Sequence, residues 1–238
     1  MNPAERLIIA LDFPDPRQAR ILADRLSNTG AAYKIGLELF LAGGPSFVAQ
    51  MASHYRIFLD LKFHDIPSTV AAAVKAAASL GVWMINIHAG GGRKMMTAAR
   101  EALANYNIKP LLLAVTVLTS LNDSQLSELG FREGAEKRAR LLATLAAESG
   151  LDGVICSPLE IKVVKETGGS DFLTVSPGIR LAGSDNNDQS RVATPREVIR
   201  AGGDYLVVGR PVRAAEDPYA AARKIIEEIG GIGLNESS

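Results

Sequence analysis

The chain has 238 residues, of which 47% are hydrophobic, and its 26 Lys and Arg residues balance its 26 Asp and Glu residues. This length and apolar content suit one large core, because α/β barrels reach this size as a single domain. The balanced charge, without a dense basic block, argues against a nucleic-acid-binding surface. No apolar run approaches the roughly 18 residues of a membrane span, so we expect no membrane partner and a cytoplasmic location.

Short aliphatic runs alternate with longer, alanine-rich segments of helical period, as is typical of repeated strand and crossover-helix units. Ser68 and the pair Thr194-Pro195 are predicted to cap helix starts. The expected strands are 7–13, 32–36, 57–62, 83–88, 111–118, 153–157, 172–176 and 205–208. The expected helices are 16–27, 46–53, 68–80, 93–105, 133–149, 159–166, 195–201 and 218–229.

Strands that are apolar at successive positions must be covered on both faces, which requires a parallel sheet inside a layer of helices. Strand and helix units of this number close into a (β/α)8 barrel, so we expect an α/β TIM barrel that forms a single domain over residues 1–238. The alternative is an open doubly wound sheet, but no GxGxxG motif follows the first predicted strand. We expect the tail at 231–238 to be frayed.

The segment DLKFHDIPST at 60–69 places two carboxylates around one lysine where an apolar strand ends. In a (β/α)8 barrel, the carboxyl ends of the strands form the active site. A lysine beside two aspartates is kept protonated and can be presented to a substrate as an acid. We therefore predict that Asp60, Lys62 and Asp65 are catalytic.

Polar residues also stand at the ends of other predicted strands, which would bring them to one mouth of the barrel. They are Asp12, Lys34, Asn86, His88, Thr119, Ser120, Arg180, Gly209 and Arg210. Gly209 and Arg210 offer a backbone N–H and a guanidinium to an oxyanion, and Arg180 comes from the neighbouring strand. The polar segment 182–190 suits a mobile lid. Cys156 lies in an apolar run and is predicted to be a packed core residue.

Four segments resemble the orotidine 5′-phosphate decarboxylase family of the bacterial type. They are DLKFHDIPST at 60–69, SPGIR at 176–180, Gln189 and VVGRP at 207–211, and the similarity extends from Leu7 to about Ile229. The family often has threonine where this chain has Ser176. The resemblance implies decarboxylation of orotidine 5′-phosphate to uridine 5′-phosphate and CO2 in pyrimidine biosynthesis, without a metal or an organic cofactor.

The resemblance also implies residue roles. Lys62 matches the proton donor to carbon 6 of the pyrimidine, and Asp60 lies against the departing carboxylate. Asp65 reaches across a homodimer interface into the neighbouring site, together with Ile66 and Thr69. The other matched residues bind substrate: Asp12 and Lys34 (also counted as catalytic) at the ribose, Thr119 and Ser120 near the pyrimidine, Pro177 in the SPGIR segment, and Arg180, Gln189, Gly209 and Arg210 at the phosphate.

Three alternatives stay open. Related barrels with the same DxKxxD spacing, 3-keto-gulonate 6-phosphate decarboxylase and hexulose-phosphate synthase, hold magnesium with a glutamate at the end of the second strand; Lys34 at this position would repel the metal. A phosphosugar isomerase or epimerase would need a pair of catalytic bases or a set of metal ligands, which His54, His64 and His88 do not supply. We expect His64 and His88 to orient other groups or to pack, and not to titrate in catalysis. A non-enzymatic protein would bind uridine monophosphate without turnover.

Overall fold

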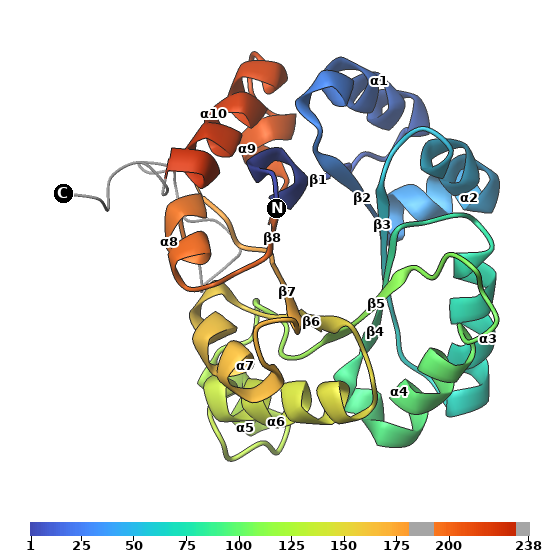
Figure 1. Ribbon diagram of the computed structural model, residues 1–238, viewed down its shortest axis with the longest axis vertical. Coiled ribbons are helices and arrows are strands. Elements are labelled where there is room, and N and C mark those ends of the chain that lie inside the picture. The colour runs from blue at the N-terminus through green and yellow to red at the C-terminus, as the bar shows by residue number, and fades with distance from the viewer. Residues whose placement is uncertain (181–192, 232–238) are drawn as a thin grey trace.

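Eight parallel strands close into one barrel in chain order, and β8 pairs with β1 to complete it. The computed structural model describes residues 1–180 and 193–231. Figure 1 shows the helices as a ring outside the barrel. The predicted (β/α)8 fold is therefore confirmed. The expected lid at 182–190 and the tail from 232 onward lie outside the described residues.

The strands match their predicted positions closely, apart from their ends. Their bounds are β1 (Leu7–Ala10), β2 (Ala32–Gly36), β3 (Ile57–Phe63), β4 (Met84–His88), β5 (Leu111–Val115), β6 (Gly153–Ile155), β7 (Leu173–Ser176) and β8 (Tyr205–Val208). β1 stops before the expected Phe13 because the backbone turns there, and Phe13 N donates to Leu11 O at 3.0 Å. This turn is what directs Asp12 toward the barrel mouth.

The helices differ more from expectation than the strands do. α2 begins at Leu37 instead of residue 46, and a kink at Gly44 (φ 69°) before Pro45 divides it. The start of α3 follows Ile66, so Ser68 is not its N-cap, whereas Thr194 caps α8 as predicted. The bounds are α1 (Pro16–Leu26), α2 (Leu37–Ala52), α3 (Pro67–Ala78), α4 (Gly92–Glu101), α5 (Asp123–Glu128), α6 (Ala135–Glu148), α7 (Ile161–Gly168), α8 (Pro195–Arg200), α9 (Arg210–Arg213) and α10 (Pro218–Gly230), with 3-10 helices η1 (Pro3–Arg6), η2 (Ser27–Thr29), η3 (Ala89–Gly91) and η4 (Pro158–Glu160).

The helices α5 and α9 were not predicted, because each is too short to show a helical period. Each buries a single side chain, Leu126 in α5 and Val212 in α9. α9 directly follows β8 and begins at Arg210. This small helix therefore sets the direction of a predicted substrate-binding residue.

The core has two layers because alternate strand residues point into and out of the barrel. Ile8, Phe58 and Tyr205 belong to the layer that fills the barrel. Leu7 and Ile9 belong to the layer between the strands and the helices. Both layers are apolar, which explains the uninterrupted hydrophobic runs in the sequence.

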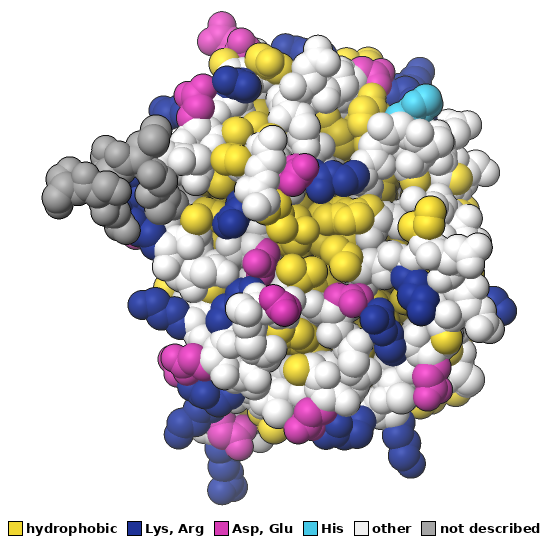
Figure 2. All heavy atoms as spheres, in the orientation of Figure 1, with side chains coloured by type: hydrophobic (Ala, Val, Ile, Leu, Met, Phe, Trp, Pro, Cys, Tyr) yellow, Lys and Arg dark blue, Asp and Glu magenta, His cyan; other side chains and the backbone are white. Residues whose placement is uncertain are grey.

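The face formed by the amino ends of the strands is apolar near its centre (Figure 2). Figure 2 shows hydrophobic side chains gathered near the middle of this face, with charged side chains mainly around them. Trp83 precedes β4 there; its ring packs edge-on against Tyr205 with centroids 5.3 Å apart, and the Arg56 guanidinium lies 4.9 Å from the Trp83 ring. Among the described residues, no helix is both long and apolar enough to cross a membrane.

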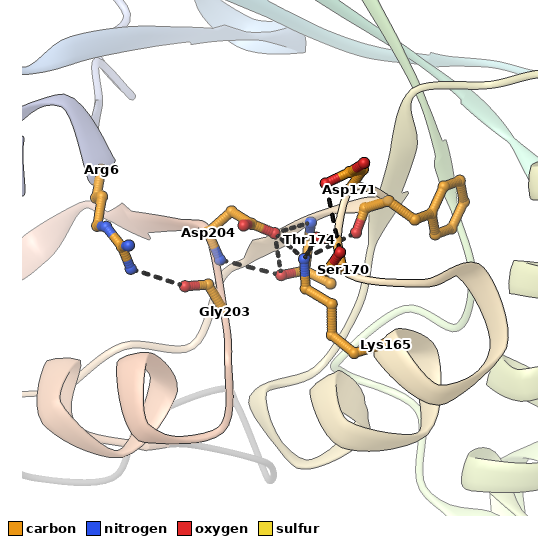
Figure 3. A network of polar contacts seen from close by, with 8 residues as sticks. Arg6, Lys165, Ser170, Asp171, Thr174, Gly203 and Asp204 are labelled. Carbon is orange, nitrogen blue, oxygen red and sulfur yellow. Dashed lines mark hydrogen bonds and ion pairs between the residues drawn. The ribbon is translucent and has the colours of Figure 1, made fainter. Parts of the chain in front are cut away.

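A polar network joins β7 and β8 at their amino ends (Figure 3). Lys165 Nζ donates to Asp204 Oδ2 at 2.7 Å and to the carbonyl of Phe172 at 2.9 Å. Asp204 Oδ2 also accepts from Thr174 N at 2.8 Å, and Asp204 N donates to Thr174 Oγ1 at 3.1 Å. The Asp204 carboxylate thus accepts a backbone hydrogen bond of β7 that a neighbouring strand would otherwise accept. Because the side chains of Lys165 and Asp204 are only 17% and 19% exposed, we expect this network to stabilise the fold.

We expect Asp204→Ala to lower the free energy of unfolding by about 3 kcal/mol, because it leaves the Lys165 ammonium without its counter-charge and the Thr174 N–H without its acceptor. Urea denaturation followed by circular dichroism measures this change. Glu166→Gln is the control, since the Arg140–Glu166 pair has side chains 50% and 64% exposed and contributes little. Equal midpoints for the two variants would contradict the assignment.

Candidate active site

A cavity of about 330 Å³ opens at the carboxyl ends of the strands. Its wall combines apolar residues such as Phe58, Val115 and Val207 with polar side chains. The predicted site residues that line it are Asp12, Lys34, Asp60, Lys62, Thr119, Pro177, Arg180, Gly209 and Arg210. The barrel therefore brings together residues from β1, β2, β3, β5, β7 and β8 and the segments that follow them.

Asp12, Lys34, Asp60 and Lys62 form a line of alternating charge across three neighbouring strands. Lys34 Nζ lies 3.0 Å from Asp12 Oδ1 and 3.4 Å from Asp60 Oδ2. Lys62 Nζ donates to the other Asp60 oxygen, Oδ1, at 2.6 Å. The Asp60 carboxylate is thus held between two ammonium groups. Its side chain is 11% exposed and that of Lys62 is 32% exposed, so the lysine is the member more open to a ligand.

Neighbouring charges in this line favour the ionised forms of Asp60 and Lys34. Desolvation raises the pKa of Asp60, but Lys34, Lys62 and the Asn86 amide more than offset it, and the pKa lies below its ordinary value. Desolvation lowers the pKa of Lys34, yet Asp60 and Asp12 outweigh it and raise the pKa overall. Both groups are therefore ionised at neutral pH, and Asp60 keeps a negative charge beside the Lys62 ammonium.

A bulge in β3 directs the Lys62 side chain. β3 pairs with β4 at Leu59 opposite Ile85 and again at Phe63 opposite Ile87. Asp60, Leu61 and Lys62 therefore lie opposite the single residue Asn86. Lys62 has φ 51°, in the left-handed region that non-glycine residues rarely adopt. Such a conformation costs about 1–3 kcal/mol and is found where a site requires it.

Two residues of the site had no predicted role. Asn86 is fully buried; its Nδ2 donates to Asp60 Oδ1 at 2.6 Å and its Oδ1 accepts from Lys62 N at 2.8 Å. Gly36 pairs with Asp60, and a Cβ there would lie 3.1 Å from Lys34 Nζ. In the sequence, Asn86 could have been noticed as an amide side chain within an otherwise apolar strand. Gly36 could have been noticed because it lies two residues after Lys34, at the end of the same predicted strand.

The opposite side of the cavity carries guanidinium groups. Arg180 follows β7; its backbone N donates to Ala193 O at 3.0 Å, and its side chain donates to Ile179 O at 2.9 Å. Gly209 lies between β8 and Arg210, and a Cβ on Gly209 would be 3.6 Å from the Cβ of Ala10. Two arginines beside a glycine suit an oxyanion such as phosphate. Gln189 lies outside the described residues.

Four predicted site residues do not line this cavity: Asp65, Ile66, Thr69 and Ser120. All four are exposed. Asp65 accepts a hydrogen bond from Ile66 N at 2.6 Å, and the Ile66 side chain is 64% exposed. In this chain, the carboxylate that contacts Lys62 is Asp60. The roles of these four residues stay predictions.

His88 and Cys156 are not poised for acid–base or nucleophilic chemistry. Burial, followed by His64 and Lys62, lowers the pKa of His88, which favours the neutral ring. The rings of His64 and His88 pack with centroids 5.2 Å apart. Cys156 is fully buried, and burial raises the pKa of its thiol. The prediction that Cys156 is a core residue is confirmed.

Comparisons with known proteins agree with the resemblance. The family model described as orotidine 5′-phosphate decarboxylase / HUMPS family matches residues 5–225. A Saccharophagus degradans protein named orotidine 5′-phosphate decarboxylase is 50% identical over 233 residues, which cover 98% of each chain. A Nitrosococcus oceani protein of the same name is 52% identical over 228 residues, 95% of this chain and 98% of the other.

Solved structures agree as well. The crystal structure of orotidine 5′-phosphate decarboxylase from Lactobacillus acidophilus is 39% identical, covers 94% of this chain and 99% of its own, and superposes with a TM-score of 0.83. Sequence, fold and the line of charges at the barrel mouth therefore lead to the same conclusion: the chain belongs to the orotidine 5′-phosphate decarboxylase / HUMPS family.

Proposed function

We propose that this chain decarboxylates orotidine 5′-phosphate to uridine 5′-phosphate and CO2 in de novo pyrimidine biosynthesis, without a metal ion. The observation that carries the proposal is the Lys62 ammonium, which lines the cavity and lies 2.6 Å from an ionised carboxylate. The names of relatives about 50% identical over nearly the whole chain support the choice of substrate.

The cavity is polar at two ends, which orients such a substrate. Arg180 and Arg210 follow β7 and β8, where (β/α)8 barrels often bind phosphate. Asp12 and Lys34 suit the ribose hydroxyls, and apolar wall residues such as Val115 and Val207 suit the pyrimidine ring. With its phosphate on the arginines, the substrate would turn carbon 6 toward β3.

Lys62 stabilises the charge that forms when CO2 departs. The bond between carbon 6 and the carboxylate breaks, and its electron pair stays on carbon 6 in the plane of the ring, where π-delocalisation cannot spread it. An ammonium fixed in advance lowers the energy of this anion without reorganising solvent. Lys62 then transfers its proton to carbon 6 as a general acid and completes uridine 5′-phosphate.

Asp60 has two effects on the same step. It anchors the Lys62 ammonium, and it faces the substrate carboxylate with a like charge. Two unit charges 4 Å apart repel by roughly 4 kcal/mol at an effective dielectric constant of 20. Departure of CO2 relieves this repulsion. We assign the larger share of the rate to the lysine, because a preorganised charge acts directly on the developing anion.

The donor set favours chemistry without a metal. Magnesium prefers several oxygen ligands around an open position. Here Lys34 Nζ lies within 3.4 Å of both Asp12 and Asp60, so an ammonium already occupies the space between these two carboxylates. A divalent cation placed between them would be repelled by Lys34 and Lys62.

The exposed residues Asp65, Ile66 and Thr69 support a homodimer with shared sites. They follow β3 directly, so they lie beside the mouth of their own barrel without lining its cavity. Ile66 presents an apolar side chain to solvent, as a residue at an interface would. We propose that Asp65 enters the partner's site and adds a second carboxylate near the partner's lysine.

Lys62→Ala should lower kcat by at least about 10⁴-fold, because it removes both the field and the proton donor. Binding of uridine monophosphate, measured by calorimetry, should change little, since the arginines remain. The loss of orotate absorbance measures turnover. Lys94→Ala, at an exposed lysine of α4, is the control and should keep wild-type activity. Substantial turnover by Lys62→Ala would remove the lysine from its role.

Exhaustive treatment with EDTA should leave the rate unchanged, because no step requires a Lewis acid. The same absorbance assay, run before and after chelation and again with added Mg²⁺, measures this. Loss of activity with chelator and recovery with Mg²⁺ would favour the magnesium-dependent relatives instead.

Mixed dimers test the shared site. A hybrid of a Lys62→Ala chain with an Asp65→Asn chain carries one intact site, so equal mixing after reversible dissociation should recover about a quarter of wild-type activity. Each variant alone should be nearly inactive. Light-scattering and native mass spectrometry verify that hybrids form, and hybrids without activity would refute the sharing of Asp65.

A further inference from the structure

We propose that Asn86 is a positioning residue that holds both Lys62 and Asp60 in their reactive arrangement. The inference rests on the proposed function and adds to it a residue outside the cavity wall. Asn86 lies in the middle of β4, is fully buried and touches the two charged residues from behind.

The first task of Asn86 is to replace a missing strand contact. Since three residues of β3 lie opposite one residue of β4, regular pairing stops between Leu59 and Phe63. The backbone N–H of Lys62 falls in this gap and donates to Asn86 Oδ1 at 2.8 Å. A buried N–H without an acceptor costs about 1–3 kcal/mol. The side-chain oxygen therefore stabilises the left-handed conformation that turns Lys62 into the cavity.

Its second task is to fix the carboxylate. Asn86 Nδ2 donates to Asp60 Oδ1 at 2.6 Å, the same oxygen that accepts from Lys62 Nζ at 2.6 Å. A neutral amide can do this without adding a charge to the line. The carboxylate is thereby oriented so that its second oxygen faces Lys34 at 3.4 Å.

The two tasks require one donor and one acceptor on a short side chain. Asparagine provides both, whereas ionised aspartate has two acceptors and alanine has neither. The groups around position 86 are Asp60 and Lys62 on β3, Lys34 behind Asp60 on β2, and His88 on β4 itself; β5 presents the uncharged Leu113 opposite Asn86. A carboxylate at position 86 would therefore meet Asp60 at close range.

Asn86→Ala should lower kcat about 100-fold, the size of effect expected when a reacting group is displaced by about 1 Å. KM and the Kd of uridine monophosphate should stay within about threefold, since the arginine side of the cavity is untouched. Thr116→Val is the matched control: Thr116 is also buried near the barrel mouth, and its hydroxyl donates to the carbonyl of Ile155 at 3.1 Å, away from Asp60 and Lys62. It should lose stability and keep kcat.

Asn86→Asp provides a signature that loss of packing cannot produce. When protonated, the new carboxyl donates to Asp60 and accepts from Lys62 N–H, as the amide does. When ionised, it repels Asp60. The facing carboxylates raise the pKa for the shared proton. The kcat of this variant should therefore be highest at acidic pH and fall as pH rises toward neutrality, whereas wild-type activity should fall toward acid, where Asp60 takes up a proton.

The outcomes separate this inference from the proposed function. Absence of turnover by the wild-type chain would refute the function itself. Wild-type turnover together with Asn86→Ala activity near that of Thr116→Val, or an Asn86→Asp pH profile like that of the wild type, would refute the role of Asn86. If Asn86→Ala fails to bind uridine monophosphate because it is misfolded, the pH profile of Asn86→Asp decides whether Asn86 has the proposed role. A crystal structure of Asn86→Ala should show Lys62 leaving the left-handed region, and that of Thr116→Val should not.

Discussion

The Asp60 carboxylate is the group on which the rest of the site depends. It accepts hydrogen bonds from Lys62 and Asn86 on one oxygen and faces Lys34 with the other. A carboxylate this deeply buried stays ionised only because three donors surround it. In return it raises the pKa of Lys34, which keeps that group charged, and it holds both ammonium groups in place. Removing any partner would leave charges buried without compensation, so this small cluster behaves as one unit.

The barrel makes such a cluster possible at low cost. Residues far apart in sequence reach one mouth because all strands run parallel and end at the same edge. The register places Gly36 beside Asp60, and the absence of a side chain there leaves room for the Lys34 ammonium. The apolar inner layer below the cavity excludes water, which strengthens every electrostatic contact above it.

The barrel fold and most of the charged residues at its mouth could be predicted from the sequence. The fold follows from a regular alternation of strands and helices, and the motif at 60–69 is compact. Strand positions came from runs of apolar residues, and the charged strand ends followed from the barrel. The kink in α2 was missed because Gly44-Pro45 reads as a break between helices. The role of Asn86 was missed because it depends on the pairing of β3 with β4, which a single strand's sequence does not encode. The contribution that we propose for Asp65 would depend on a second chain, so the pattern of one chain does not show it.

The bulge that places three residues of β3 opposite one residue of β4 also limits how this site could be built into another protein. Asp60, Leu61 and Lys62 together lie opposite the single residue Asn86. The spacing of the motif therefore includes the extra backbone of the bulge as well as the side chains that act in the site. Grafting an aspartate and a lysine onto a regular strand of another barrel would therefore leave the ammonium misdirected. A designer would have to import the extra length of the strand and, on its neighbour, an amide to complete it.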